Sequence, residues 1–118
     1  IIHNIPRDSV VYTGTHDNTP VKGWFMQDAT YEERERLTEY LGYEPETDEI
    51  PEIFVRLAMM SRADTAIVPV QDILGLDSSA RMNRPGTDEG NWRWRMHEGM
   101  ITEKTAEYLL KLVKVYGR

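Results

Sequence analysis

The chain contains no cysteine among its 118 residues. A disulfide framework, a thiolate metal site and a cysteine nucleophile are therefore excluded. Long apolar runs are missing too, since none approaches the roughly 20 residues that a membrane-spanning helix requires. Residues 1–6 lack the basic start and the apolar segment of a signal peptide. We expect a soluble cytoplasmic protein with no membrane partner.

Basic residues are in short supply, with 14 Lys and Arg against 20 Asp and Glu and a formal charge of −6. Because nucleic-acid binding depends mainly on neutralising phosphates, this charge argues against a nucleic-acid partner. A hydrophobic fraction of 40% and a charged fraction of 29% are typical of an ordinary globular protein. The length suits one domain of modest core.

Two runs of β-branched and aromatic residues, at 10–14 and 65–70, predict buried strands. The sequence between them has helical patterns, so the strands are expected to be parallel and joined by a crossover connection. Residues 71–100 show little periodicity and predict a long loop, although Trp92 and Trp94 argue against disorder. This order of elements predicts an α/β fold that is rich in helix.

Helices are expected after Pro20 and over residues 31–41, 49–61 and 103–117. Thr30-Tyr31-Glu32-Glu33 has the pattern of a capping box, Gly42 is placed to end that helix, and Thr102 is expected to cap the last one. The apolar residues at helical spacing are expected to face the core. They are Val21, Trp24, Phe25, Leu37, Tyr40, Leu41, Ile50, Ile53, Phe54, Leu57, Ala58, Ala106, Leu109, Leu110, Val113 and Tyr116.

Only two clear strands are predicted, and two parallel strands cannot hide their own edges. The simplest explanation is that the chain is a piece of a larger α/β barrel or sheet. The open strand edges then predict self-association of the separate chain, or partial unfolding.

The first predicted strand runs directly into Thr15-His16-Asp17-Asn18. Active-site residues of α/β proteins sit at the C-terminal ends of parallel strands, so this stretch is a candidate site. The alternative is a polar junction in which Asp17 and Asn18 cap the following helix. This stretch alone does not decide between them.

Three blocks of sequence carry a more specific signal. The blocks are Val11-Tyr12-Thr13-Gly14-Thr15-His16-Asp17-Asn18 with Gly23-Trp24, then Val68-Pro69-Val70-Gln71-Asp72-Ile73-Leu74-Gly75-Leu76, then Ala80-Arg81-Met82-Asn83-Arg84-Pro85-Gly86-Thr87 with the following residues 89–95. In this order and spacing they resemble the 4-α-glucanotransferases (amylomaltases or disproportionating enzymes, glycoside hydrolase family 77). The resemblance covers most of the chain. It implies that residues 1–118 are a single C-terminal segment of a catalytic (β/α)8 TIM barrel, the last two β/α units, with strands near Val10 and Ile67.

The resemblance also implies an activity, the transfer of α-1,4-glucan segments between maltooligosaccharides by a retaining mechanism, with no cofactor and no metal. Such a mechanism needs two carboxylates about 5 Å apart. In the family pattern the nucleophile and the acid/base lie upstream of these blocks, so the isolated chain is expected to be inactive. Asp17 matches a third carboxylate, which stabilises the cationic transition state.

The remaining site residues are also implied by the resemblance. His16 matches a histidine that hydrogen-bonds the sugar, and Asn18 belongs to the same block. Asn83 and the turn of Pro85 and Gly86 resemble a loop beside the donor-sugar subsite, and ordinary turn chemistry is the alternative for them. The implied partner is therefore a maltooligosaccharide or α-1,4-glucan.

Parts of the sequence would also suit other functions. His16-Asp17 would suit a metal-dependent phosphohydrolase, but only His3 and His97 remain as further histidine ligands. Trp92-Arg93-Trp94-Arg95 would suit a non-catalytic module that stacks on carbohydrate or nucleic acid. For the two tryptophans we favour buried anchors of the loop over sugar stacking; in an extended segment they would share one face. The chain could also make no functional contact by itself.

Overall fold

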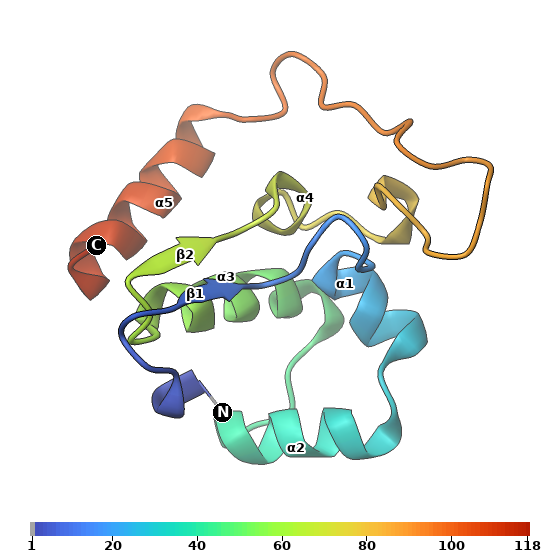
Figure 1. Cartoon of the computed structure of the whole chain (residues 1–118). Helices are drawn as coiled ribbons and strands as arrows, with labels where there is room; N and C mark the ends of the chain where they lie inside the picture. The colour runs from blue at the N-terminus through green and yellow to red at the C-terminus, as the bar shows by residue number, and fades with distance from the viewer. Residues whose placement is uncertain (1) are drawn as a thin grey trace.

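The computed structural model describes residues 2–118 (Figure 1). Strands β1 (Val10–Tyr12) and β2 (Thr65–Ile67) form a two-stranded parallel sheet, in which Val10 lies opposite Thr65 and Tyr12 opposite Ile67. A helical connection joins the two strands. The predicted parallel pair with a helical crossover is therefore confirmed.

The connection begins with α1 (Val21–Gly23), which continues as a π-helix over Trp24–Asp28, and goes on through α2 (Tyr31–Leu41) and α3 (Ile50–Met60). The predicted capping box is present: Thr30 Oγ1 accepts from the Glu33 N–H at 3.2 Å, and Glu33 Oε2 accepts from the Thr30 N–H at 2.9 Å. Gly42 ends α2 in the left-handed conformation, with φ of 82°. These local signals were predicted correctly because each depends on residues within one helical turn.

After β2 the structure differs from the expectation. The strand ends at Ile67, and a short helix α4 (Val70–Ile73) follows Pro69, so the predicted strand over 65–70 was too long. A proline has no N–H for the sheet ladder and suits the start of a helix. Residues 71–100 thus include part of α4 and a 3-10 helix at Ser78–Ala80. The last helix, α5 (Glu103–Tyr116), is capped by Thr102 as predicted.

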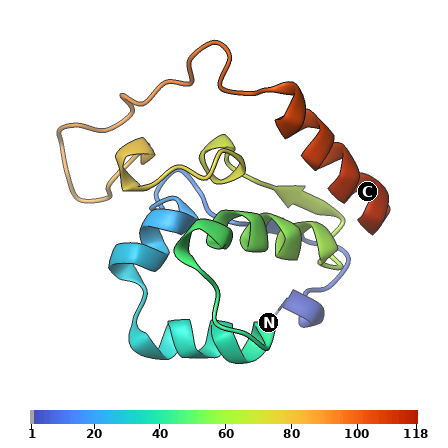
Figure 2. The same cartoon turned by 180° about the vertical axis from the view of Figure 1, so that it is seen from behind.

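The core lies between α1 and α3. Val21, Phe25 and Ile50 are its buried residues, and Trp24, Leu37 and Phe54 pack against them from partly buried positions. α3 also contacts α4, α5 and β2. In Figures 1 and 2 the chain between residues 81 and 101 arches over this body without regular structure.

The prediction that the strands are buried is wrong for the described chain. Val10 is 45% exposed, Tyr12 50% and Ile67 46%. A sheet of two strands needs other elements to cover the face that α3 does not reach. Within residues 2–118, no helix is long and apolar enough to span a membrane.

The predicted set of core-facing helical residues is wrong at several positions. Tyr40, Ala106 and Leu110 are exposed, although helical spacing placed them among the core-facing residues. Leu112 and Val55, which the pattern did not select, are almost fully buried. α5 has apolar residues around much of its circumference, and its contact with α3 decides which stripe is covered. The other predicted residues outside the buried core are partly buried.

Candidate functional site

The candidate site lies where β1 and β2 end. β1 runs into the turn that carries His16, Asp17 and Asn18, and the chain beyond β2 brings Asn83 to the same place. The Asn83 N–H donates to the carbonyl oxygen of His16 at 3.0 Å. The structure therefore brings His16 and Asp17 of the first sequence block together with Asn83 of the third.

Asp17 is held at one carboxylate oxygen. Asn83 Nδ2 donates to Asp17 Oδ1 at 2.7 Å, across 66 positions of sequence, and His16 Nε2 lies 3.3 Å from the same atom. No hydrogen bond from residues 2–118 reaches Oδ2, and the side chain is 46% exposed. Asp17 thus has one oriented oxygen and one oxygen open to a ligand.

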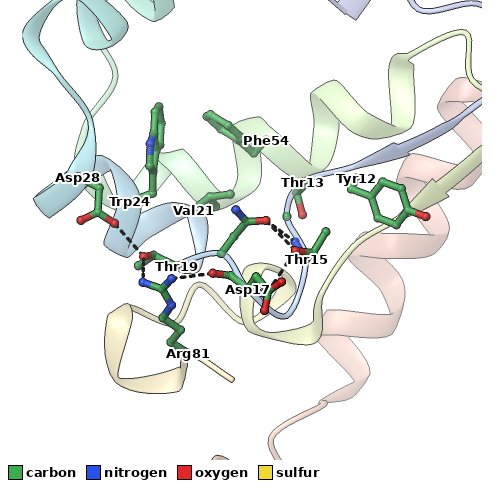
Figure 3. Close-up of a pocket in the computed structure, with 12 residues that line it drawn as sticks. Tyr12, Thr13, Thr15, Asp17, Thr19, Val21, Trp24, Asp28, Phe54 and Arg81 are labelled. Atoms are coloured by element: carbon green, nitrogen blue, oxygen red, sulfur yellow. Dashed lines mark hydrogen bonds between the residues drawn. The ribbon is translucent and has the colours of Figure 1, made fainter. Parts of the chain in front are cut away.

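Arg81 connects the two segments that carry Asp17 and Asn83. Its guanidinium donates to the Asp17 carbonyl oxygen at 2.6 Å, to Thr19 Oγ1 at 2.9 Å and to the Asn83 carbonyl oxygen at 2.8 Å. Thr19 Oγ1 in turn donates to Asp28 Oδ2 at 2.8 Å (Figure 3). Sequence reasoning missed Arg81, although it stands inside the third block, two positions before Asn83.

Asp17 and Arg81 line a cavity of about 470 Å³ that also has an aromatic wall (Figure 3). The polar side is formed largely by the turn after β1, and the apolar side by the core helices. A cavity with aromatic surface and a few fixed polar groups is typical of a small-molecule site. Its other lining residues include Tyr12, Asn18, Trp24 and Phe54.

Asn18 stabilises the turn itself. Its Oδ1 accepts from the Thr15 N–H at 2.8 Å and from Thr15 Oγ1 at 3.0 Å. Neither Asn18 nor Asp17 caps the following helix, because the Val21 N–H at the start of α1 donates to Asp72 Oδ1 at 2.9 Å. The capping alternative is therefore wrong, and the cap comes from a distant residue that the sequence did not indicate.

Asp72 is the second residue that sequence reasoning missed. It is only 2% exposed, and Thr13 Oγ1 donates to its Oδ2 at 2.6 Å. Burial raises the pKa of Asp72 above its ordinary value, and the hydrogen bonds from Thr13 and Val21 oppose that rise. The sequence contained this aspartate in its second block, without a sign of its role.

Neither Pro85 nor Gly86 lines the 470 Å³ cavity that Asp17 lines. Both are exposed, and Gly86 takes the left-handed conformation with φ of 78° in a turn closed by the Thr87 N–H on the Arg84 carbonyl oxygen at 3.2 Å. Arg81 and Asn83 also line a second, polar cavity of about 390 Å³, together with residues of this loop. The structure therefore joins Asn83 to Asp17 and leaves Pro85 and Gly86 as turn residues beside a neighbouring cavity.

Trp92 packs on the candidate site from outside. Its ring centroid lies 5.1 Å from that of His16, and the side chain is 51% exposed, so the prediction of a buried anchor is wrong for this residue. Trp94 is partly buried. Trp92 has φ of 61°, which also excludes an extended chain at this point. A non-glycine residue in this conformation costs about 1–3 kcal/mol, and its N–H donates to the Met82 carbonyl oxygen at 2.6 Å.

Metal ligands do not gather at this site. Across residues 2–118 there is no group of three or more His, Asp or Glu side chains placed to hold a metal ion.

The last arginine of the Trp92-Arg93-Trp94-Arg95 stretch points back to its own segment. Arg95 Nη1 donates to the carbonyl oxygens of Trp92 and Trp94 at 2.9 and 3.0 Å.

Comparison with known proteins gives a consistent result. The family model described as 4-alpha-glucanotransferase matches residues 1–102. The chain is 46% identical over 116 residues to the 4-alpha-glucanotransferase of Aquifex aeolicus (strain VF5), and 46% identical over 115 residues to a chloroplastic/amyloplastic 4-alpha-glucanotransferase of Oryza sativa subsp. japonica. These matches cover 98% of this chain but only 23% and 19% of the two relatives.

The fold agrees with that family. An amylomaltase from Streptococcus agalactiae, solved in complex with acarbose, superposes on 100% of this chain and 23% of its own, with a TM-score of 0.90 at 34% sequence identity. The chain thus spans about a fifth to a quarter of the length of the relatives it matches. Its sequence and its fold together show that the chain belongs to the 4-alpha-glucanotransferase family, glycoside hydrolase family 77.

Proposed function

We propose that this chain is part of a 4-α-glucanotransferase that transfers α-1,4-glucan segments between maltooligosaccharides by a retaining mechanism. The observation that carries the proposal is the carboxylate of Asp17, fixed at one oxygen by Asn83 and open at the other, on the wall of a cavity at the strand ends. The relatives carry this activity in their names, and a solved relative holds acarbose.

In this mechanism Asp17 is the transition-state stabiliser. Breaking a glycosidic bond passes through an oxocarbenium-like state whose ring carries positive charge. A carboxylate that is already oriented lowers the energy of that cation more than that of the neutral ground state, and therefore raises turnover. The free Oδ2 of Asp17 is the atom that would face the sugar, since Oδ1 is engaged by Asn83.

His16, Asn18, Asn83, Pro85 and Gly86 are proposed as sugar contacts. His16 is exposed beside Asp17 and can donate a hydrogen bond to a hydroxyl. Contact with the Trp92 ring, which is tilted by 37° against the imidazole, limits the rotation of His16. Pro85 and Gly86 do not themselves line the adjoining 390 Å³ cavity, but Arg84 and Thr87 on either side of them do, so a sugar bound there would lie beside their turn.

The chain would act as one part of a catalytic (β/α)8 barrel, with β1 and β2 as its last two strands and the nucleophile and acid/base supplied by other strands. The exposed apolar residues of β1 and β2 support this, because neighbouring barrel strands and core residues would cover them. The alternative of a Trp-Arg-Trp-Arg binding module gains little support, since Arg95 donates to its own segment. The cytoplasmic location stays a prediction.

A chimaera tests the proposal directly. In the Aquifex aeolicus relative, the segment aligned with this chain is replaced by this sequence, and glucose release from maltotriose is measured. We expect Asp17→Asn to lower kcat by about 1,000-fold with KM changed by less than about threefold, because the lost charge acts mainly in the transition state. The matched control is Asp8→Asn, an exposed aspartate just before β1, at the opposite end of the same strand.

Loss of activity in both variants would point to a general effect of removing charge. If Asp17→Asn kept kcat within about threefold of the unmutated chimaera, the proposed role of Asp17 would be refuted.

A further inference from the structure

Asp72 is almost completely buried, yet it is no part of the proposed chemistry. It comes from α4, which follows β2, and both of its carboxylate oxygens accept hydrogen bonds from the β1 side of the molecule. Thr13 Oγ1 donates to Oδ2 at 2.6 Å, and the Val21 N–H donates to Oδ1 at 2.9 Å. Both contacts bridge more than 50 positions of sequence, at separations of 59 and 51.

The two donors mark the ends of one segment. Thr13 is the first residue after β1, and Val21 is the first residue of α1. The turn between them carries His16, Asp17 and Asn18. One carboxylate therefore holds both ends of the turn that presents the candidate site.

We propose that Asp72 is a positioning residue for the transferase reaction: it holds the segment from Thr13 to Val21 so that the Asp17 carboxylate points into the cavity. This inference rests on the proposed function. It goes beyond that function by assigning a role to a group more distant from the sugar.

The neighbouring residue on α4 supports the same conclusion. Gln71 is also buried, and its Nε2 donates to the Ala80 carbonyl oxygen at 3.2 Å. Ala80 directly precedes Arg81, whose guanidinium binds the Asp17 carbonyl oxygen. α4 thus contacts both segments that meet at the site, one through Asp72 and the other through Gln71.

A carboxylate suits this place better than an amide. Ionised Asp72 only accepts hydrogen bonds, and both of its partners are oriented as donors. An asparagine could accept from the Val21 N–H, but its NH2 group would face the Thr13 hydroxyl and reverse that hydrogen bond. The raised pKa shows that burial disfavours the charged form, so the charge is kept at some cost to stability. A loss of folding stability of this kind is expected at a residue that is kept for function and not for stability.

The test uses the same chimaera. We expect Asp72→Asn to lower kcat by about 10- to 100-fold, because a displacement of about 1 Å at a reacting group has effects of that size. KM should stay within about threefold, and the thermal midpoint should not fall, because the buried charge is removed. The matched control is Asp64→Asn, an exposed aspartate just before β2, which should leave all three quantities unchanged.

Thr13 supplies a second pair of variants, in case Asp72→Asn folds poorly. Thr13→Val removes the hydroxyl with little change of volume and should lower kcat by about tenfold, and Thr13→Ser, which keeps the hydroxyl, should recover most of that loss. Recovery by serine would identify the hydrogen bond to Asp72 as the cause, because serine lacks the methyl group that packing would require.

Amide hydrogen exchange of residues 14–19 gives a readout that does not depend on activity. We expect faster exchange there in Asp72→Asn and Thr13→Val, with unchanged exchange in α3. Unchanged exchange in the turn, or full kcat in both variants, would overturn the role of Asp72. If instead Asp17→Asn kept full activity while the exchange still rose, Asp72 would order the turn and only the proposed function would fail.

Discussion

Substitution of Arg81 is expected to disturb the position of Asp17 most directly, because Arg81 binds the backbone of that residue. Its guanidinium makes three hydrogen bonds at once, to two backbone carbonyl oxygens and one hydroxyl, and thereby links the turn after β1 to the segment that carries Asn83. A lysine keeps the charge but lacks the planar fork that can reach all three acceptors. We therefore expect Arg81→Lys to lose two of the three hydrogen bonds.

The magnitude follows from those contacts. A hydrogen bond from a charged group contributes about 1.5–3 kcal/mol, and the lower end applies because Arg81 is only partly buried. Two such losses amount to about 3 kcal/mol. At 1.36 kcal/mol per factor of ten, this corresponds to about a 100-fold lower kcat if the whole loss appears at the transition state.

The assay is the kcat for glucose release from maltotriose by the chimaera, with the thermal midpoint measured in parallel. Arg62→Lys is the matched control, since Arg62 is an exposed arginine at the start of the connection to β2. A kcat for Arg81→Lys within about twofold of the unmutated chimaera would refute the reasoning, because the turn would then keep its geometry without the guanidinium. An equal loss in Arg62→Lys would refute it as well.

Three further predictions concern stability and assembly. Because burial raises the pKa of Asp72 above 3.8, the folded state binds its proton more tightly than the unfolded state, so this group's contribution to stability falls as pH rises from 3.8 through the raised pKa. In the chimaera, the thermal midpoint of Asp72→Asn minus that of the unmutated protein should therefore increase as pH rises over this range. A difference that does not change with pH would contradict the raised pKa of Asp72. Gly23→Ala should destabilise by about 1–3 kcal/mol in denaturant unfolding, because a Cβ there would lie 2.5 Å from Ser78 Oγ and 2.7 Å from Ser78 N. Adding Ser78→Ala should recover only part of this, since the backbone contact remains, and full recovery would show that the backbone gives way. The separate chain should self-associate through the edges of β1 and β2, or be partly unfolded, and a well-folded monomer in sedimentation would contradict this.

The elements that were predicted well depend on neighbours in sequence. The capping box at Thr30, the helix end at Gly42 and the cap at Thr102 each involve residues within about one turn, so their pattern is complete in the sequence itself. The parallel pairing was predicted from the helical length of the connection, which leaves few other arrangements. In contrast, the exposure of Leu110 and the burial of Leu112 depend on how α5 packs against α3. The sequence of α5 has apolar residues on more than one face, so it does not show which face is covered.

The site residues show the same contrast between local and distant interactions. His16, Asp17 and Asn83 were selected by their motifs, and the structure brings them together. Arg81 and Asp72 were not selected. Apart from the bond of Arg81 to Asn83, their hydrogen bonds at the site reach residues 51 to 64 positions away, and no local pattern signals such a bond.

In the proposed (β/α)8 barrel, the exposure of the strands and the half-exposed Asp17 are connected. A carboxylate stabilises a developing cation strongly only where water is excluded, because the effective dielectric constant then falls. Asp17 follows the same strand on which Val10 and Tyr12 are exposed, and β2 beside it exposes Ile67. In that proposed barrel, neighbouring strands would cover those apolar side chains, close the sheet around the site and bring the proposed nucleophile and acid/base toward Asp17. We therefore expect that the burial of β1 and β2 and the full electrostatic effect of Asp17 depend on the same assembly step.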